Sequence, residues 1–175
     1  MSKTLIKGGL LGGIVIFIWM AISWMLIPWH MATLHSFTSE TTVAQVMKEN
    51  APQSGIYMMP LQANANQQSS GPMVFAAVHQ EGMTSMPEAM LIELVCQIVT
   101  AFLVTWMLMK TARLNYWGRV GFVFVFAITT SIASNVPYWT WFHFSTGFTL
   151  VSIADILISW LLAGLVIAKV VPEKM

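Results

Sequence analysis

Hydrophobic residues occur in four long stretches along this chain of 175 residues, and polar segments separate them. The first stretch, residues 8–27, contains no charged residue. At a rise of about 1.5 Å per residue, a helix of this length crosses a hydrocarbon core of about 30 Å. Three further stretches have a similar character: residues 86–109, 120–136 and 148–168. We therefore predict four transmembrane helices joined by more polar segments.

The third stretch needs a choice between helix and strand. Phe122, Phe124 and Phe126 alternate with other residues, as they would in a strand. A lone strand in lipid would leave its backbone groups without hydrogen bonds, so a helix is predicted. Pro137 is expected to end it, because proline lacks the N–H that continues a helix. Two short connecting segments follow from these boundaries: residues 110–119 and 137–147.

The segment between the first two stretches, residues 28–85, is mostly polar and is predicted to form a small α+β insertion. Thr42 to Gln45 fits the spacing of a capping box, which indicates a short helix. Two runs of β-branched and aromatic residues indicate a β-hairpin, and the polar residues 62–70 between them predict a mobile loop. The expected elements are a helix at about residues 40–50 and strands at about residues 55–61 and 72–79.

The positive charges are distributed unevenly about the four stretches. Seven of the eight Lys and Arg residues fall on one side: Lys3, Lys7, Lys110, Arg113, Arg119, Lys169 and Lys174. Only Lys48 lies on the other side. Short segments rich in Lys and Arg stay in the cytoplasm, so this asymmetry predicts cytoplasmic N- and C-termini. Residues 169–175 would then be a cytoplasmic tail.

Aromatic residues provide an independent check on the boundaries of the predicted helices, and three of them fall at the predicted inner surface: Trp106, Tyr116 and Trp117. Tryptophan and tyrosine concentrate at membrane surfaces, and five of them fall at the predicted outer surface: Trp24, Trp29, Tyr138, Trp139 and Trp141. The predicted fold class is an all-α membrane protein, a four-transmembrane-helix bundle with a small extracytoplasmic α+β insertion between its first two helices. The predicted location is a bacterial-type inner (plasma) membrane, which the chain crosses several times.

Composition narrows the classes of function. Hydrophobic residues make up 57% of the chain and charged residues 9%, against about 25% in soluble domains. The formal net charge of +1 gives no basic field for nucleic acid. Cys96 is the single cysteine, so the chain cannot form an internal disulfide. The sequence has no phosphate-binding glycine loop, no H-E-x-x-H and no G-x-S-x-G motif, and it therefore nominates no catalytic residue and no cofactor.

Two carboxyl groups lie within the predicted spans. Glu93 and Asp155 fall at a similar depth in the outer half of the second and fourth helices. A charge there costs about 2.5–3.5 kcal/mol unless it faces protein, water or a partner. We expect the two acids to face each other across an outward-facing polar cavity that holds a ligand or ion. Further polar residues are assigned to it by helical spacing: Gln97, Ser131, Asn135 and Ser152. The alternative is that these side chains only bond the helices together.

No Lys or Arg is available at that depth to neutralise the acids. Candidate partners are a bound cation or the histidines His30, His35 and His143, which lie near the outer ends of the spans. A protonated carboxyl group is the remaining alternative. The same histidines, with the many methionines on that side, form a candidate metal site, because thioethers and imidazoles suit copper(I).

Glycines near the start of the chain suggest close helix packing. Gly8, Gly9, Gly12 and Gly13 form two overlapping GxxxG spacings in the first span. Such glycines allow another helix to approach closely, so they predict a membrane-protein partner or self-association within the lipid bilayer. Simple flexibility at a helix start is the alternative.

Three hypotheses for function follow. The first is a non-enzymatic membrane protein that acts as an accessory, assembly or ligand-binding subunit. The second is a small transporter or binding protein for a proton, a cation or a cationic amphiphile, using Glu93 and Asp155. The third is a metal-handling or lipid-modifying protein that uses the outer histidines.

Overall fold

The computed structural model of the protein describes residues 2–61, 71–82, 85–111 and 114–172. Its elements are α1 (Ser2–Met25), the 3-10 turn η1 (Met31–Thr33), α2 (Glu40–Asn50), β1 (Gly55–Met59), β2 (Val74–Val78), α3 (Met86–Lys110), α4 (Tyr116–Trp141) and α5 (Thr146–Val170). The helices α1, α3, α4 and α5 are long and apolar enough to cross a membrane, which confirms the prediction of four such helices. The chain divides into two compact units, a helical bundle (residues 1–34 and 86–175) and an insertion (residues 35–85).

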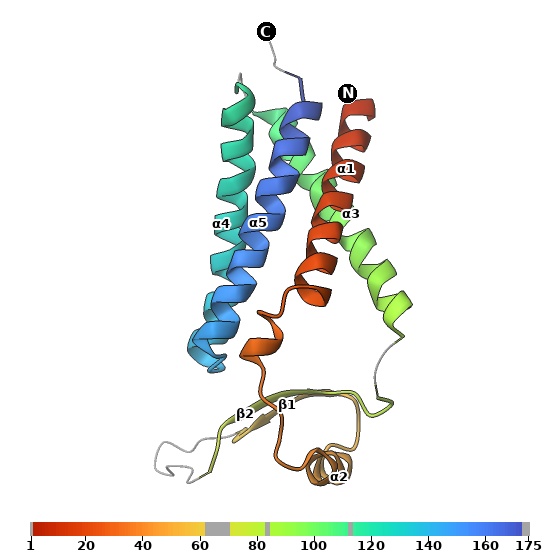
Figure 1. Ribbon diagram of the computed structural model, residues 1–175, viewed down its shortest axis with the longest axis vertical. Coiled ribbons are helices and arrows are strands. Elements are labelled where there is room, and N and C mark those ends of the chain that lie inside the picture. Colours follow the sequence, from red (N-terminus) through yellow and green to blue (C-terminus); the bar gives the residue numbers. More distant parts are fainter. Residues whose placement is uncertain (1, 62–70, 83–84, 112–113, 173–175) are drawn as a thin grey trace. The chain divides into compact units, whose positions relative to one another are not determined.

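The bundle is organised around α1 and α5. The main contacts of α1 are with α3 on one side and with α5 on the other, and α5 also packs on α4 (Figure 1). Small side chains allow this packing, because Ala101, Ala127 and Ala163 are completely buried. Larger apolar residues complete the core: Ile16, Val104, Leu108, Val123, Trp160 and Ile167.

The glycines of α1 bring its neighbours into close approach. All four are buried, and a Cβ added to Gly13 would lie 2.5 Å from Ile98 Cα of α3. A Cβ added to Gly12 would lie 2.8 Å from Ile167 Cδ1 of α5. The close packing that the sequence predicted is therefore made within the chain, by α3 and α5.

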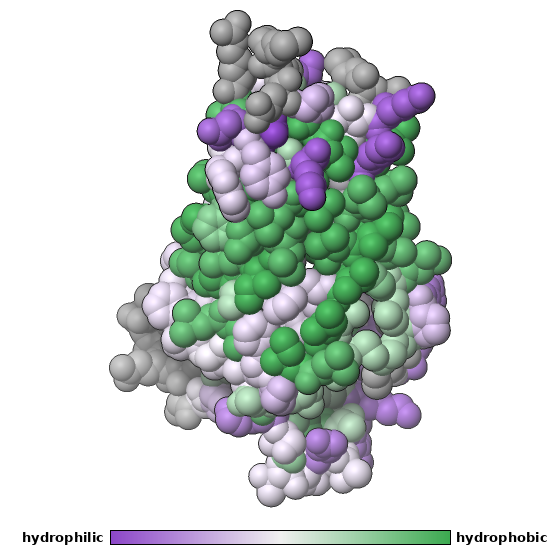
Figure 2. All heavy atoms as spheres, turned by 45° about the horizontal axis from the view of Figure 1, so that its top comes forward, coloured by the Kyte–Doolittle hydropathy of each residue, from purple (hydrophilic) through white to green (hydrophobic). Residues whose placement is uncertain are grey.

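One end of the bundle carries its basic side chains, and we call it the lysine end. Its described members are Lys3, Lys7, Lys110, Arg119 and Lys169. The start of α1 and the end of α5 both lie at this end (Figure 1). Figure 2 shows hydrophilic side chains gathered there and a continuous belt of hydrophobic side chains next to them. This arrangement suits helices whose middle parts face lipid.

The insertion contains the predicted helix and β-hairpin. β1 and β2 are antiparallel, with Gly55 opposite Val78 and Met59 opposite Val74. The residues predicted as a mobile loop, 62–70, lie outside the described residues.

The predicted capping box of α2 is wrong. The motif implies a helix that begins after Thr42, whereas α2 begins at Glu40. The Ser39 hydroxyl accepts a hydrogen bond from the Thr42 N–H at 3.4 Å. A serine directly before a helix can cap the N–H three residues later, and Ser39 takes that role here.

Pro137 does not end its helix, contrary to the prediction. It lies inside α4, which continues to Trp141. Proline removes only its own N–H from the backbone pattern, and later groups close the final turn. The Phe142 N–H donates to the Tyr138 carbonyl at 3.2 Å, and the Thr140 hydroxyl donates to the Val136 carbonyl at 3.0 Å. The stretch with alternating phenylalanines is helical, as predicted.

Candidate functional site

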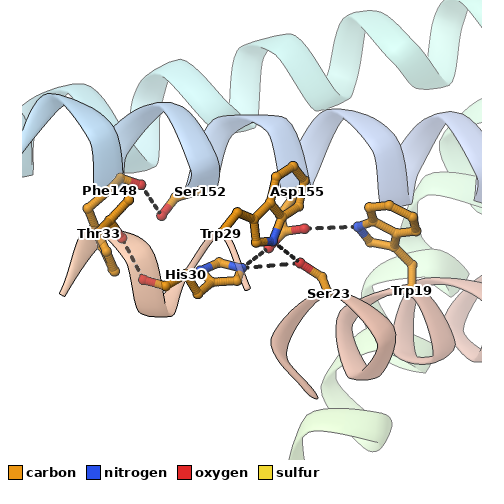
Figure 3. Close-up of polar contacts among 8 residues, drawn as sticks. All are labelled: Trp19, Ser23, Trp29, His30, Thr33, Phe148, Ser152 and Asp155. Carbon is orange, nitrogen blue, oxygen red and sulfur yellow. Dashed lines mark hydrogen bonds and ion pairs between the residues drawn. The ribbon is translucent and has the colours of Figure 1, made fainter. Parts of the chain in front are cut away.

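The end of α1 and the turn after it position the most buried polar groups of the bundle. The Leu26 and Ile27 N–H groups both donate to the Ile22 carbonyl, which closes the helix, and Pro28 cannot continue it. The chain then forms the short turn η1, held by a hydrogen bond from the Thr33 N–H to the His30 carbonyl at 3.0 Å. This turn directs the His30 side chain toward α5 (Figure 3).

His30 and Asp155 form a buried pair. The distance from His30 Nε2 to Asp155 Oδ2 is 2.6 Å, and the two side chains are 1% and 2% exposed. The other carboxylate oxygen, Oδ1, accepts a hydrogen bond from the Trp19 Nε1–H at 3.0 Å (Figure 3). Both oxygens of the acid are therefore hydrogen-bonded inside the bundle. His30 was one of the three histidines considered as partners for the acids, and it is the one that contacts Asp155.

Ser23 and Trp29 extend the hydrogen-bond network of the buried pair. Ser23 Oγ lies 3.2 Å from His30 Nε2 and accepts a hydrogen bond from the Trp29 Nε1–H at 2.8 Å. Because Trp29 directly precedes His30, this bond also fixes the turn that carries the imidazole. The network thus connects two turns of α1, the segment that follows it and the middle of α5 (Figure 3).

Aromatic rings enclose the imidazole. The Trp24 ring stacks on it, with a centroid distance of 3.8 Å and an interplanar angle of 11°. The Trp29 ring meets it edge to face at 5.9 Å and also contacts Trp19 at 6.4 Å. These rings screen the pair from lipid, and they strengthen its hydrogen bonds because they lower the local polarity.

One polar atom of this network has no partner. Within the described residues, His30 Nδ1 is buried and makes no hydrogen bond. A proton on Nε2, directed at Asp155, would leave Nδ1 as a free acceptor. A proton on Nδ1 would instead leave a buried donor unpaired, which costs about 1–3 kcal/mol. The contacts therefore favour the form in which Nε2 donates to the carboxylate.

The prediction that Glu93 and Asp155 face each other is wrong. Asp155 is directed toward α1, whereas Glu93 is exposed on α3 and accepts a hydrogen bond from Gln97 of the same helix. The physical reason is the glycine face of α1, formed by Gly8, Gly9, Gly12 and Gly13. It allows both α3 and α5 to pack closely on α1, so that α1 keeps the two acids apart.

The remaining polar candidates bond to their own helices. Ser131 donates to the Ile128 carbonyl at 2.9 Å, and Asn135 donates to the Ser131 carbonyl at 3.0 Å. Ser152 donates to the Phe148 carbonyl at 2.9 Å (Figure 3). Such local bonds satisfy a polar side chain in a helix without another helix. The structure does not bring these three side chains to Glu93.

A groove between α1 and α3 lies next to the buried pair. Its volume is about 460 Å³. The two helices that line it diverge away from the lysine end (Figure 1). Nine residues line it: Phe17, Met20, Ala21, Trp24, Met25, Met86, Ala89, Met90 and Glu93. Glu93 is the single ionisable residue of this lining. Trp24 belongs to both features, because its ring lines the groove and stacks on His30.

The predicted metal site finds no support in the described residues. They contain no group of three or more His, Cys, Asp or Glu side chains that could hold a metal ion. His143 is exposed after the end of α4, and His35 belongs to the insertion.

Sequence reasoning missed four of the residues that build this site: Trp19, Ser23, Trp24 and Trp29. Two of these tryptophans were assigned to the membrane surface, and Trp19 and Ser23 received no role. A signal was nevertheless present, since Ser23, Trp24, Trp29 and His30 fall within eight residues around Pro28. Polar and aromatic residues concentrated at a helix end indicate a packed turn as readily as a surface anchor.

Comparisons with protein-family models, with curated proteins and with solved structures found no match for this chain. Its function is therefore inferred from the geometry of the groove and the buried pair.

Proposed function

We propose that the protein is a non-enzymatic membrane protein that binds a cationic amphiphile in the groove between α1 and α3. The lining carries this proposal, because eight apolar residues surround one carboxylate and no Lys or Arg lies among them. An alkyl chain would lie along the apolar wall, and its charged head would meet Glu93. The four methionines of the lining are flexible enough to adapt to chains of different shape.

The distribution of charge supports a cation as the ligand. In the described part of the bundle, the acids Glu88, Glu93 and Asp155 all lie away from the lysine end. Asp155 is already paired with His30, whereas Glu93 is exposed. A cation over the Trp24 ring would add about 0.5–1 kcal/mol at an exposed site.

Membrane orientation completes the proposal. Short lysine-rich segments favour the cytoplasm, so the lysine end and both termini would lie inside a bacterial-type inner membrane. The groove would then open in the outer leaflet, and the insertion would be extracytoplasmic. Amphiphiles that enter from outside would reach this leaflet first. In this position the protein would act as a binding or accessory subunit for such molecules.

Glu93→Gln is expected to weaken binding of a cationic amphiphile about fivefold, because it removes one partly solvated charge interaction. The probe is (11-bromoundecyl)trimethylammonium, whose bromine quenches nearby tryptophan fluorescence, titrated into protein in phosphatidylcholine nanodiscs. Glu88→Gln is the matched control, since it removes an equal charge from α3 outside the groove. Uncharged 11-bromoundecanol should bind both variants and the original protein alike. Equal affinities of the two glutamine variants for the cation would contradict the proposal.

Proton-coupled transport is a second candidate function, favoured by the free acceptor Nδ1 of His30 beside a buried carboxyl group. In vesicles with a pH gradient and an internal pH dye, the cationic amphiphile should then accelerate proton movement through the protein. Asp155→Asn is expected to abolish this acceleration and to leave groove binding intact. Ser152→Ala, a change in a self-bonded neighbour on α5, should leave both unchanged. Identical traces with and without protein would remove this candidate.

A further inference from the structure

A second groove lies at the lysine end of the bundle. Its volume is about 390 Å³, and it is lined by residues of α1, α4 and α5: Leu11, Tyr116, Leu165, Val166, Lys169 and Val170. The Tyr116 hydroxyl donates to the Leu165 carbonyl at 3.1 Å, which holds the tyrosine ring in place as part of the wall. The groove is thus an apolar hollow with one lysine in its lining.

Among the described residues, the charged side chains around this groove are positive. Lys7 lies one helical turn before Leu11 on α1, so it shares the face of α1 that borders the hollow. Lys7 and Lys169 are both exposed. The described acids of the bundle all belong to its other half, as noted above, so they do not neutralise these lysines.

The helix dipole explains only part of this arrangement. A lysine in the last turn of a helix is favourable on its own, and Lys169 occupies that position in α5. The dipole does not account for an apolar hollow beside the lysine, nor for Lys7, which lies in the second turn of α1, where the dipole has little effect. A ligand that is both apolar and anionic accounts for both.

We infer that this groove binds an anionic phospholipid. One acyl chain lies against Leu11, Val166 and Val170, and the phosphate group lies between Lys7 and Lys169. A free phosphate ion would gain nothing from the apolar wall, and a neutral lipid would gain nothing from the lysines. Basic hollows between transmembrane helices recognise anionic head groups by this combination of contacts. This site is independent of the proposed cationic ligand, because it has the opposite charge preference and lies at the opposite end.

The test compares phosphatidylglycerol with phosphatidylcholine of identical acyl chains, each titrated into the purified full chain and followed by native mass spectrometry. The original protein should prefer phosphatidylglycerol at least tenfold, since each lysine contributes about fivefold. The double variant Lys7→Gln with Lys169→Gln should lose this preference. Lys110→Gln is the matched control, because Lys110 also lies at the lysine end but packs over the Trp106 ring, 5.6 Å from its centroid, outside the groove.

A second pair of variants tests the hollow itself. Leu11→Trp should fill it and weaken phosphatidylglycerol binding, whereas Leu10→Trp changes an equally exposed neighbour outside the lining. Both positions are about half exposed, so both variants should fold. The inference would be overturned if Leu11→Trp and Leu10→Trp weakened phosphatidylglycerol binding equally. It would also be overturned if Lys110→Gln reduced the lipid preference as much as the double lysine variant does, because general surface attraction would then explain the binding. Equal competition by soluble glycerol 3-phosphate would overturn the assignment to a lipid.

Discussion

Asp155→Ala is expected to lower the free energy of unfolding by about 3–5 kcal/mol, because it removes one partner of a buried hydrogen-bonded pair. Two groups lose their acceptor at once, the His30 imidazole and the Trp19 indole N–H. The imidazole cannot turn to water, since the His30 side chain is 1% exposed. The measurement is reversible unfolding in mixed micelles of a mild detergent and sodium dodecyl sulfate, followed by far-UV circular dichroism.

Ser159→Ala is the matched control for this substitution. Ser159 is equally buried on α5 but donates to the Ile156 carbonyl of its own helix, so its loss should cost about 1 kcal/mol or less. The double variant His30→Leu with Asp155→Leu should be more stable than either single leucine variant, because neither member of the pair is then left without its partner. A cost for Asp155→Ala as small as that for Ser159→Ala would show that the pair does not stabilise the bundle.

The sequence predicted the four spanning helices well, because length and hydrophobicity are properties of each segment by itself. The stretch with alternating phenylalanines shows why this worked, since lipid leaves a helix as the only way to satisfy its backbone. Pro137 shows a limit. A proline near a helix end removes one hydrogen bond, and side chains such as that of Thr140 decide whether the next turn still forms.

The site was predicted only in part, because spacing assigns residues to one face of a helix but does not say what that face meets. Asp155 was recognised as an acid in need of a partner, and His30 was among the candidates. Glu93 was placed opposite Asp155 because of their equal depth and the polar residues spaced along each helix. The structure separates the two acids, because Gly12 and Gly13 allow α1 to pack between the helices that carry them. Which helix a polar face contacts depends on how all the helices pack, and residue spacing along one helix does not contain that information.

The glycine face of α1 should therefore control both stability and binding. Gly13→Ala is expected to lower the free energy of unfolding by about 1–3 kcal/mol, because the new methyl group overlaps the backbone of α3. Its Cβ would lie 2.5 Å from Ile98 Cα and 2.7 Å from Ile98 N, and backbone atoms cannot turn aside as a side chain can. The same unfolding experiment in mixed micelles measures this cost.

Gly121→Ala in α4 provides the control, because a Cβ at that position would meet nothing within 4 Å. Alanine is the better helix former, so this change should stabilise the protein by up to about 1 kcal/mol. Gly13→Ala should also weaken binding of the cationic probe although Glu93 is unchanged, since it moves α1 away from α3 and reshapes the groove between them. If Gly13→Ala and Gly121→Ala had the same effect on stability, α1 and α3 would not be in close contact, and the groove would lose the packing that forms it.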